Sequence, residues 1–345
     1  MYKALVRMDF TLTIYKKLVI CLKTQDYCFI TCRDYQNASL LTPFSSLCIL
    51  RHDVDRIAKN ALKMAQLEHS FGIRGTYYFR VVPESYDLEV MNKIAEMGHE
   101  IGYHYGDVSL VSSRQCAVGR GQRSEVRGQR SEVRSQRSEV RGQRAEVRNQ
   151  NKELDREKLI DAAYESFCGN LGILRRNFDI KTICMHGSPW SKYDNRMIWE
   201  KYDYRELGII GEPYFDIDFS EVLYLTDTGR RWDGDAVNVR DKVGLSIDDC
   251  RLTKGLTIDD SRLTNEKNMT MNEKLGLRFR GTQDIIDAAK SGLLPDKMMI
   301  TVHPQRWTNN PFLWTKELVW QNVKNVGKRI IVKNFKERVT SFKGE

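Results

Sequence analysis

Four short apolar runs in this chain each end in polar side chains, and this recurrence restricts the folds that the chain can adopt. The runs at residues 45–51, 100–104, 182–185 and 298–302 are predicted to be buried strands. The polar groups at their ends are His52-Asp53-Val54-Asp55, Tyr103-His104-Tyr105-Gly106-Asp107, His186-Gly187-Ser188-Pro189 and His303-Pro304. Buried carboxylates and imidazoles are costly unless they bind something, so we expect these ends to share a site.

Predicted helices separate the strands. Residues 56–71 carry apolar side chains at helical spacing and stop at Gly72, and residues 88–97 stop in the same way at Gly98. The β-branched and aromatic run 76–82 between them is a further strand. Alternating strands and helices predict an α/β fold with a parallel sheet or barrel.

The other elements are assigned by the same periodicities. The chain is predicted to end in a mostly helical segment, residues 313–342. Further helices are expected at residues 9–23, 151–176, 198–202 and 283–290, and further strands at 27–32, 207–210 and 222–225.

Two duplicated segments interrupt the pattern. Residues 121–148 are four near-identical heptapeptides, each with a single valine, and three of the four contain glycine. One apolar residue per heptad is too few for a coiled coil, so we expect a solvated low-complexity insertion. Residues 245–265 repeat a nine-residue motif and are predicted to be an expanded loop. Without the two insertions, the 345 residues approach the size of one α/β barrel domain, with its core at about 45–312.

Composition excludes several classes of protein. The net charge is +9, but the heptapeptides contribute eight arginines against four glutamates, so the remainder is weakly basic and gives no support for nucleic-acid binding. No run reaches the ~20 apolar residues of a membrane helix. The eight cysteines are scattered without a Cys-x-x-Cys pair, which predicts a reducing, cytoplasmic location. The oligomeric state is not predicted.

The strand ends contain the residues of a metal site. In parallel α/β folds the carboxyl ends of strands lie at one edge, and four of the six histidines fall at such ends. Asp53 and Asp55 have the same parity on an extended strand, so both can face one site while His52 faces away. Imidazole and carboxylate ligands suit Zn²⁺ or another divalent ion that keeps a position open for water.

The order His-Asp-Val-Asp, Gly-His-Glu-Ile-Gly-Tyr-His and a late His-Pro resembles the polysaccharide deacetylase family, also called the NodB-homology or carbohydrate esterase 4 family. The resemblance covers most of residues 47–310 outside the repeats. It implies a distorted (β/α)7 barrel, related to the TIM barrel, which uses a divalent metal to remove acyl groups from amino sugars. It places the general base on Asp53, metal ligands on Asp55 and His104, and the general acid on His303.

The chain departs from the family pattern at two positions. The family has a second histidine four residues after the first in its second motif, where this chain has Val108. The third ligand is therefore open between Asp107 and His186. The family also has a base-orienting arginine near the proline of its third motif, and no arginine stands near Pro189. What orients the base is left open.

A further polar and aromatic cluster could bind a sugar or support the base. It comprises Asp227, Arg230, Arg231, Trp232 and Asp233. Simpler roles also exist for several candidates: Asp53 and Asp55 could cap the next helix, and Trp307 could pack under the C-terminal helix.

Three functions are compatible with these residues. The first is a metal-dependent hydrolase that deacylates an N-acetylated sugar or glycan precursor. The second is a cyclic amide or ureide hydrolase on the same barrel. The third is a catalytically inactive sugar-binding relative, which Val108 and the missing arginine favour.

Overall fold

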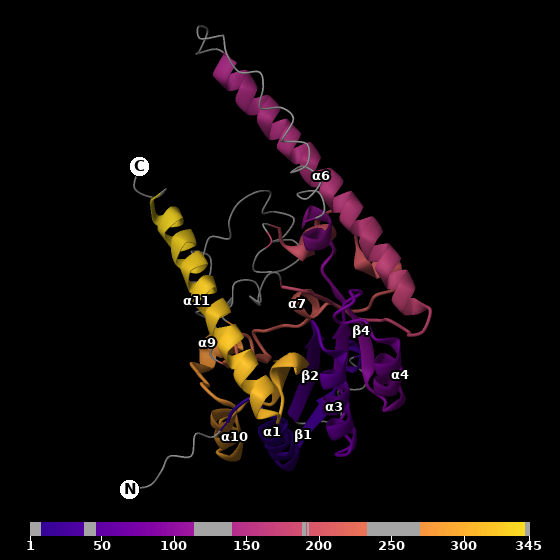
Figure 1. Ribbon diagram of the computed structural model, residues 1–345, viewed down its shortest axis with the longest axis vertical. Helices are drawn as coiled ribbons and strands as arrows, with labels where there is room; N and C mark the ends of the chain where they lie inside the picture. The colour runs from indigo at the N-terminus through magenta and orange to yellow at the C-terminus, as the bar shows by residue number, and fades with distance from the viewer. Residues whose placement is uncertain are drawn as a thin grey trace.

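A computed structural model describes residues 8–37, 46–113, 140–187, 191, 193–232 and 270–341, with backbone alone for 140–154 and 327–341 (Figure 1). The predictions for the duplicated segment 245–265, for most of the heptapeptides, and for Ser188, Pro189 and Asp233 lie outside these residues.

The strands form one parallel sheet, as the alternating pattern predicts. Their order is β5-β4-β3-β2-β7-β6, and β1 pairs with β2. The strands are β1 (Tyr27–Ile30), β2 (Ser46–Val54), β3 (Thr76–Phe79), β4 (Glu100–Tyr105), β5 (Ile183–Met185), β6 (Leu223–Thr226) and β7 (Lys297–Val302). In the described part of the chain β5 and β6 are the outer strands, so the sheet is an open half-barrel, compatible with a distorted TIM-like barrel.

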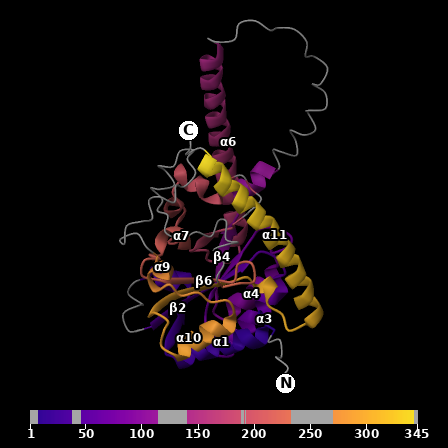
Figure 2. The same ribbon diagram turned by 90° about the vertical axis from the view of Figure 1, so that its left-hand side faces the viewer.

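Helices cover the sheet, and two long ones project beyond it. They are α1 (Leu12–Thr24), α2 (Cys32–Gln36), α3 (Ala58–His69), α4 (Leu88–Glu96), α6 (Val140–Arg175), α7 (Pro213–Asp216), α9 (Met271–Leu275), α10 (Thr282–Lys290) and α11 (Pro311–Ser341). The far ends of α6 and α11 extend past the body at the same end of the molecule (Figures 1 and 2). Helix α6 begins at Val140, so the last heptapeptide residues belong to it. None of the described helices has the length and apolar character to cross a membrane.

The strand predicted at residues 207–210 is wrong. Tyr204–Leu207 is the 3₁₀ helix η3, and Gly208 ends it with a φ of 70°. The Asp203 side chain caps the start of η3 by accepting a hydrogen bond from the Arg205 N–H. Only Gly211 pairs with the sheet, in a single parallel bridge to Thr182. The Asp203 cap and the left-handed Gly208 therefore favour a short helix here, although the apolar run predicts a strand.

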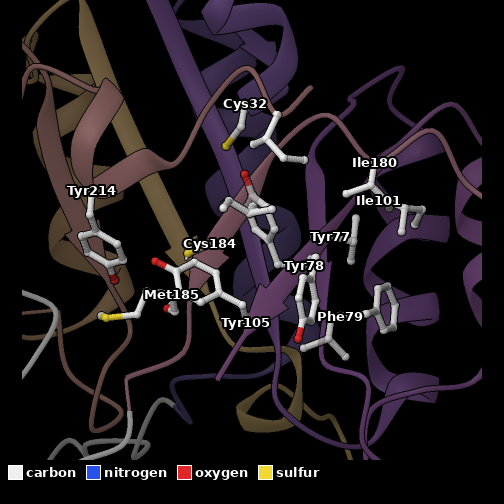
Figure 3. Packing of buried hydrophobic residues seen from close by; sticks show 14 of the residues in the cluster. Cys32, Tyr77, Tyr78, Phe79, Ile101, Tyr105, Ile180, Cys184, Met185 and Tyr214 are labelled. Atoms are coloured by element: carbon white, nitrogen blue, oxygen red, sulfur yellow. Dashed lines mark hydrogen bonds between the residues drawn. The ribbon is translucent and has the colours of Figure 1, made fainter. Parts of the chain in front are cut away.

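Strand β2 is longer than predicted and lies at the centre of the sheet. Along one edge it pairs first with β1 and then with β3, and along the other it pairs with β7. The motif from Arg51 to Val54 thus lies inside the strand, and its four residues are buried. Figure 3 shows Tyr78, Tyr105, Cys184 and Tyr214 among the buried residues that pack together in the core.

The outward face of β2 carries a buried polar network centred on Glu68 of α3. Its Oε1 accepts hydrogen bonds from Tyr15 Oη at 2.6 Å and His52 Nε2 at 2.8 Å, and its Oε2 from Tyr77 Oη at 2.9 Å. The His52 and Tyr77 rings stack at 3.9 Å. Burial opposes ionisation of Glu68, but the charge of His52 and these bonds lower its pKa. His52 therefore faces away from Asp53, as predicted, and links the strand to α1 and α3.

Replacing Glu68 by glutamine should destabilise the fold. The amide carries no charge and has one acceptor oxygen, so buried donors lose their partner at a cost of about 1–3 kcal/mol. Urea denaturation gives the free energy of unfolding. The matched control is Glu89→Gln on α4, which removes only an exposed pair with Lys93. Equal effects of the two substitutions would contradict a stabilising role for the network.

Candidate metal and acid–base site

The carboxyl ends of four strands meet at one edge of the sheet. Asp53 lies near the end of β2 and His104 near the end of β4, while His186 and His303 directly follow β5 and β7. Parallel strands present these ends on the same edge, so residues more than 200 positions apart become neighbours. Polar side chains from four strand ends therefore form one cluster.

Three atoms suited to metal coordination converge in this cluster. Asp55 Oδ1 lies 3.4 Å from His104 Nε2 and 3.4 Å from His186 Nε2. The two imidazole rings meet edge to face, with their centroids 5.2 Å apart. One carboxylate and two imidazoles with a position left for water form a ligand set that Zn²⁺ accepts.

The environment prepares these atoms for a cation. His104 Nδ1 lies 3.0 Å from the Cys184 carbonyl, which assigns the proton to Nδ1 and leaves the Nε2 lone pair facing Asp55. Burial lowers the pKa of His186 to about 3, so its imidazole is neutral near pH 7. Asp55 Oδ2 accepts a hydrogen bond from Gln305, whereas Oδ1 is buried without a hydrogen-bond donor among the described residues. A divalent ion would satisfy Oδ1, so the residues fit such a group.

Asp107, one of the two candidates for the third ligand, lies outside this group. Its Oδ2 accepts a hydrogen bond from Tyr103 Oη at 2.6 Å, and its Oδ1 from Ser166 Oγ at 2.7 Å and Asn170 Nδ2 at 2.8 Å. Both oxygens are thus used to join the end of β4 to α6. Of the two candidates that the sequence leaves open for the third ligand, the structure brings His186 to the cluster.

A second possible metal group shares His104 with Asp53 and Cys184. Burial raises the pKa of Cys184 well above its usual value, so the thiol stays protonated and is a poor ligand. Asp53 is already ion-paired with Arg51. The group of Asp55, His104 and His186 is therefore the better cation site.

Arg51 holds the candidate base. Its Nε and Nη2 donate to the two oxygens of Asp53 at 2.8 and 2.7 Å, a two-pronged pair that is completely buried on the arginine side. Burial opposes ionisation of Asp53, but the Arg51 charge outweighs it and lowers the pKa of Asp53 to about 2. Asp53 Oδ2 remains 3.9 Å from His104 Nε2 and 4.0 Å from His303 Nε2.

The sequence analysis assigns no role to Arg51, because the family pattern has its arginine near the proline of the third motif. The available signal was strand parity, since residues 51, 53 and 55 alternate to one face of an extended chain. Arg51 thus lies two residues before Asp53 and holds its carboxylate.

Asp227 supports His303. Its Oδ1 lies 2.6 Å from His303 Nδ1 and also accepts from Arg306 Nη1, and its Oδ2 accepts from Trp307 Nε1 at 2.7 Å. Burial opposes ionisation, but the charges of Arg306 and His303 lower the pKa of Asp227. A carboxylate on Nδ1 fixes the ring so that Nε2 faces the site. The Trp307 ring is buried and lies against the rings of Phe10, Tyr15 and Trp232.

Arg230 and Trp232 lie apart from these atoms. The Arg230 guanidinium lies over the rings of Phe10 and Trp314, 5.3 and 4.8 Å from their centroids. Trp232 is buried and donates from Nε1 to Thr282 Oγ1 at 3.0 Å. Arg230 thus contacts one residue near the N-terminus and one on α11, and Trp232 contacts α10. Among the described residues of the predicted cluster, Asp227 is the one that these contacts place at the site.

Sequence reasoning also missed Glu212, which is buried behind the ion pair. Its oxygens accept from the backbone N–H groups of Met185 at 2.9 Å and Tyr214 at 2.6 Å. Met185 precedes His186, and the Tyr214 hydroxyl lies 3.3 Å from Arg51 Nη2. Burial raises the pKa of Glu212 to about 7, although the two N–H groups and Arg51 oppose this shift. A glutamate in a loop gives no sequence signal for such burial.

Ionisation of Glu212 should lower the free energy of unfolding as the pH rises. Its folded-state pKa lies above the ordinary value of 4.5, so its contribution is complete in acid and is lost as the pH rises toward 7. Relative to Glu212→Gln, which cannot ionise, the wild type should lose on the order of 3 kcal/mol between pH 4 and pH 8. Urea denaturation of both proteins across this range measures the difference. Parallel stability curves would show that Glu212 does not titrate there.

Comparisons with protein-family models, curated proteins and solved structures find no match for this chain. The site geometry and the sequence motifs are therefore the basis for a functional proposal.

Proposed function

We propose that this chain is a metal-dependent hydrolase that removes an acyl group from an N-acetylated sugar or glycan precursor. The observation that carries the proposal is the convergence of Asp55 Oδ1 with the Nε2 atoms of His104 and His186, beside Asp53 and His303. The motif resemblance to polysaccharide deacetylases supports the sugar substrate, and the ligand set supports zinc among the divalent ions.

In this proposal, one residue beside the metal group accepts a proton and another donates one. A divalent ion held by Asp55, His104 and His186 would polarise the amide carbonyl and lower the pKa of water. Asp53 Oδ2 is placed to accept the proton of the attacking water, and Arg51 keeps the carboxylate ionised and oriented.

His303 is placed for the opposite transfer. Its Nε2 lies 4.0 Å from Asp53 Oδ2, so both groups border the space where an amide would be cleaved. The Asp227 carboxylate on Nδ1 stabilises a protonated ring, which can donate from Nε2 to the departing amine. Breaking the carbon–nitrogen bond needs this proton, because an amine anion is a poor leaving group.

Metal content tests the ligand assignment. The wild type should bind one divalent ion per chain, and His104→Ala and His186→Ala should each weaken binding at least about tenfold, because each removes one of three protein ligands. Plasma emission spectrometry after dialysis against a metal buffer measures the content, with circular dichroism as a check of folding.

Asp107→Asn is the matched control for this assignment. It neutralises the other candidate ligand, whose oxygens are already hydrogen-bonded to Tyr103, Ser166 and Asn170, and should leave metal content unchanged. Loss of metal in Asp107→Asn with retention in His186→Ala would reverse the ligand assignment.

Acetate release tests the reaction. Asp53→Asn should lower kcat for hydrolysis of N-acetylglucosamine derivatives by at least about 10²-fold while the metal is retained, because the amide cannot accept the proton. Coupled enzymatic detection of acetate measures the rate. Full metal occupancy with no acetate released from any N-acetyl sugar would reject the deacylase proposal and favour a sugar-binding protein or a cyclic-amide hydrolase.

A further inference from the structure

A short 3₁₀ helix after β7 is fixed at both of its ends. It is η7 (Pro304–Arg306). At its start, the Asn60 side chain of α3 donates to the Pro304 carbonyl at 3.3 Å. At its end, Arg306 Nη1 donates to the backbone carbonyl and to Oδ1 of Asp227, at 2.7 and 2.6 Å. These contacts hold the residue between them in a defined place.

That residue, Gln305, contacts the candidate metal group. Its Nε2 donates to Asp55 Oδ2 at 3.0 Å, and only 6% of the residue is exposed. A carboxylate accepts hydrogen bonds and cannot donate, so the NH₂ end of the amide is the end that faces it. The other oxygen of Asp55, Oδ1, lies 3.4 Å from the Nε2 atoms of both His104 and His186. The two carboxylate oxygens therefore have different neighbours, an amide donor and the candidate ligands.

The surroundings of the Gln305 amide favour a role in the site over a role in packing. Its Oε1 is buried and accepts no hydrogen bond from the described residues. An unsatisfied buried acceptor costs free energy, which an apolar side chain of similar length would avoid. Within the described part of the chain, the hydrogen bond to Asp55 is the polar contact that this side chain makes. The contact that offsets the cost is thus made to a candidate metal ligand.

We propose that Gln305 is a positioning residue of the metal group. By holding Oδ2 of Asp55, its amide directs Oδ1 to the ion, so that the carboxylate binds through one oxygen and a coordination position stays open for water. This inference rests on the metal group of the proposed function and does not depend on the substrate.

The same short helix also supports the candidate general acid. Arg306 contacts Asp227, and the Asp227 carboxylate lies on Nδ1 of His303. Adjacent residues of η7 therefore reach the metal group on one side and the acid–base group on the other. The position of this helix sets the orientation of a metal ligand and of a proton donor together.

Zinc affinity of the full chain tests the positioning role. Gln305→Met keeps the length of the side chain but removes the donor, and should weaken Zn²⁺ binding at least about tenfold, as loss of an outer hydrogen-bond partner of a metal ligand typically does. Gln305→Asn keeps an amide that is one methylene too short to reach Oδ2, and should weaken binding similarly. Competition with a fluorescent zinc chelator measures the affinity, and circular dichroism checks folding.

Cobalt binding adds a readout that a purely structural role would not change. When Oδ2 is released, Asp55 can bind Co²⁺ through both oxygens, which raises the coordination number of the ion. The visible absorption of bound Co²⁺ falls as its coordination number rises. The Co²⁺-loaded Gln305→Met protein should therefore absorb less strongly per bound ion than the wild type.

Gln321→Met is the matched control, because it removes another buried amide, one that donates to Asn325 on α11. It should change neither the Zn²⁺ affinity nor the Co²⁺ spectrum. Equal Zn²⁺ affinity in the wild type and both Gln305 variants would overturn the positioning role and leave the proposed function intact.

Two further results separate this inference from the proposed reaction. Weaker metal binding in the Gln305 variants, with no acetate released by the wild type from any N-acetyl sugar, would support the positioning role and reject the deacylase. A wild type that binds neither Zn²⁺ nor Co²⁺ would overturn the positioning role together with the ligand assignment.

Discussion

The buried pair of Arg51 and Asp53 on the central strand is the interaction on which the site depends. Both side chains are almost completely buried, and their bidentate hydrogen-bonded contact offsets the cost of removing the two charges from water. Breaking such a pair by removing one partner typically costs about 3–5 kcal/mol. On the opposite face of the same strand, His52 is satisfied by Glu68. The strand thus keeps polar side chains buried on both faces because each face has its own carboxylate or arginine partner.

Asp53 and Asp55 lie two residues apart in the sequence, but their carboxylates have different surroundings. Asp53 is neutralised by an arginine and keeps one oxygen directed toward the histidines, which suits a base that must stay ionised. Asp55 has no such partner on its Oδ1, which faces the Nε2 atoms of His104 and His186 and suits a cation. Their different environments follow from their neighbours and not from their own chemistry, since both are aspartates.

Segments outside the central strand orient residues at the edge of the sheet. Asp227 and its donors hold His303, and Glu212 holds the backbone next to His186. Helix α11 is attached next to this edge through the ion pair of Arg56 and Glu317. The geometry of the candidate site is therefore set by segments that reach it from separate parts of the chain.

The sequence by itself determined the parallel α/β fold and the edge where the polar residues gather, because strand and helix periods and strand-end positions are local signals. It also indicated Asp53, Asp55, His104 and His303 as the residues of interest. Only the tertiary structure brought His186 to the cluster and placed Asp107 in a hydrogen-bonded support. It likewise revealed the partners of Asp53 and His303, because a contact across the sheet depends on packing between segments and leaves no periodic trace in the chain.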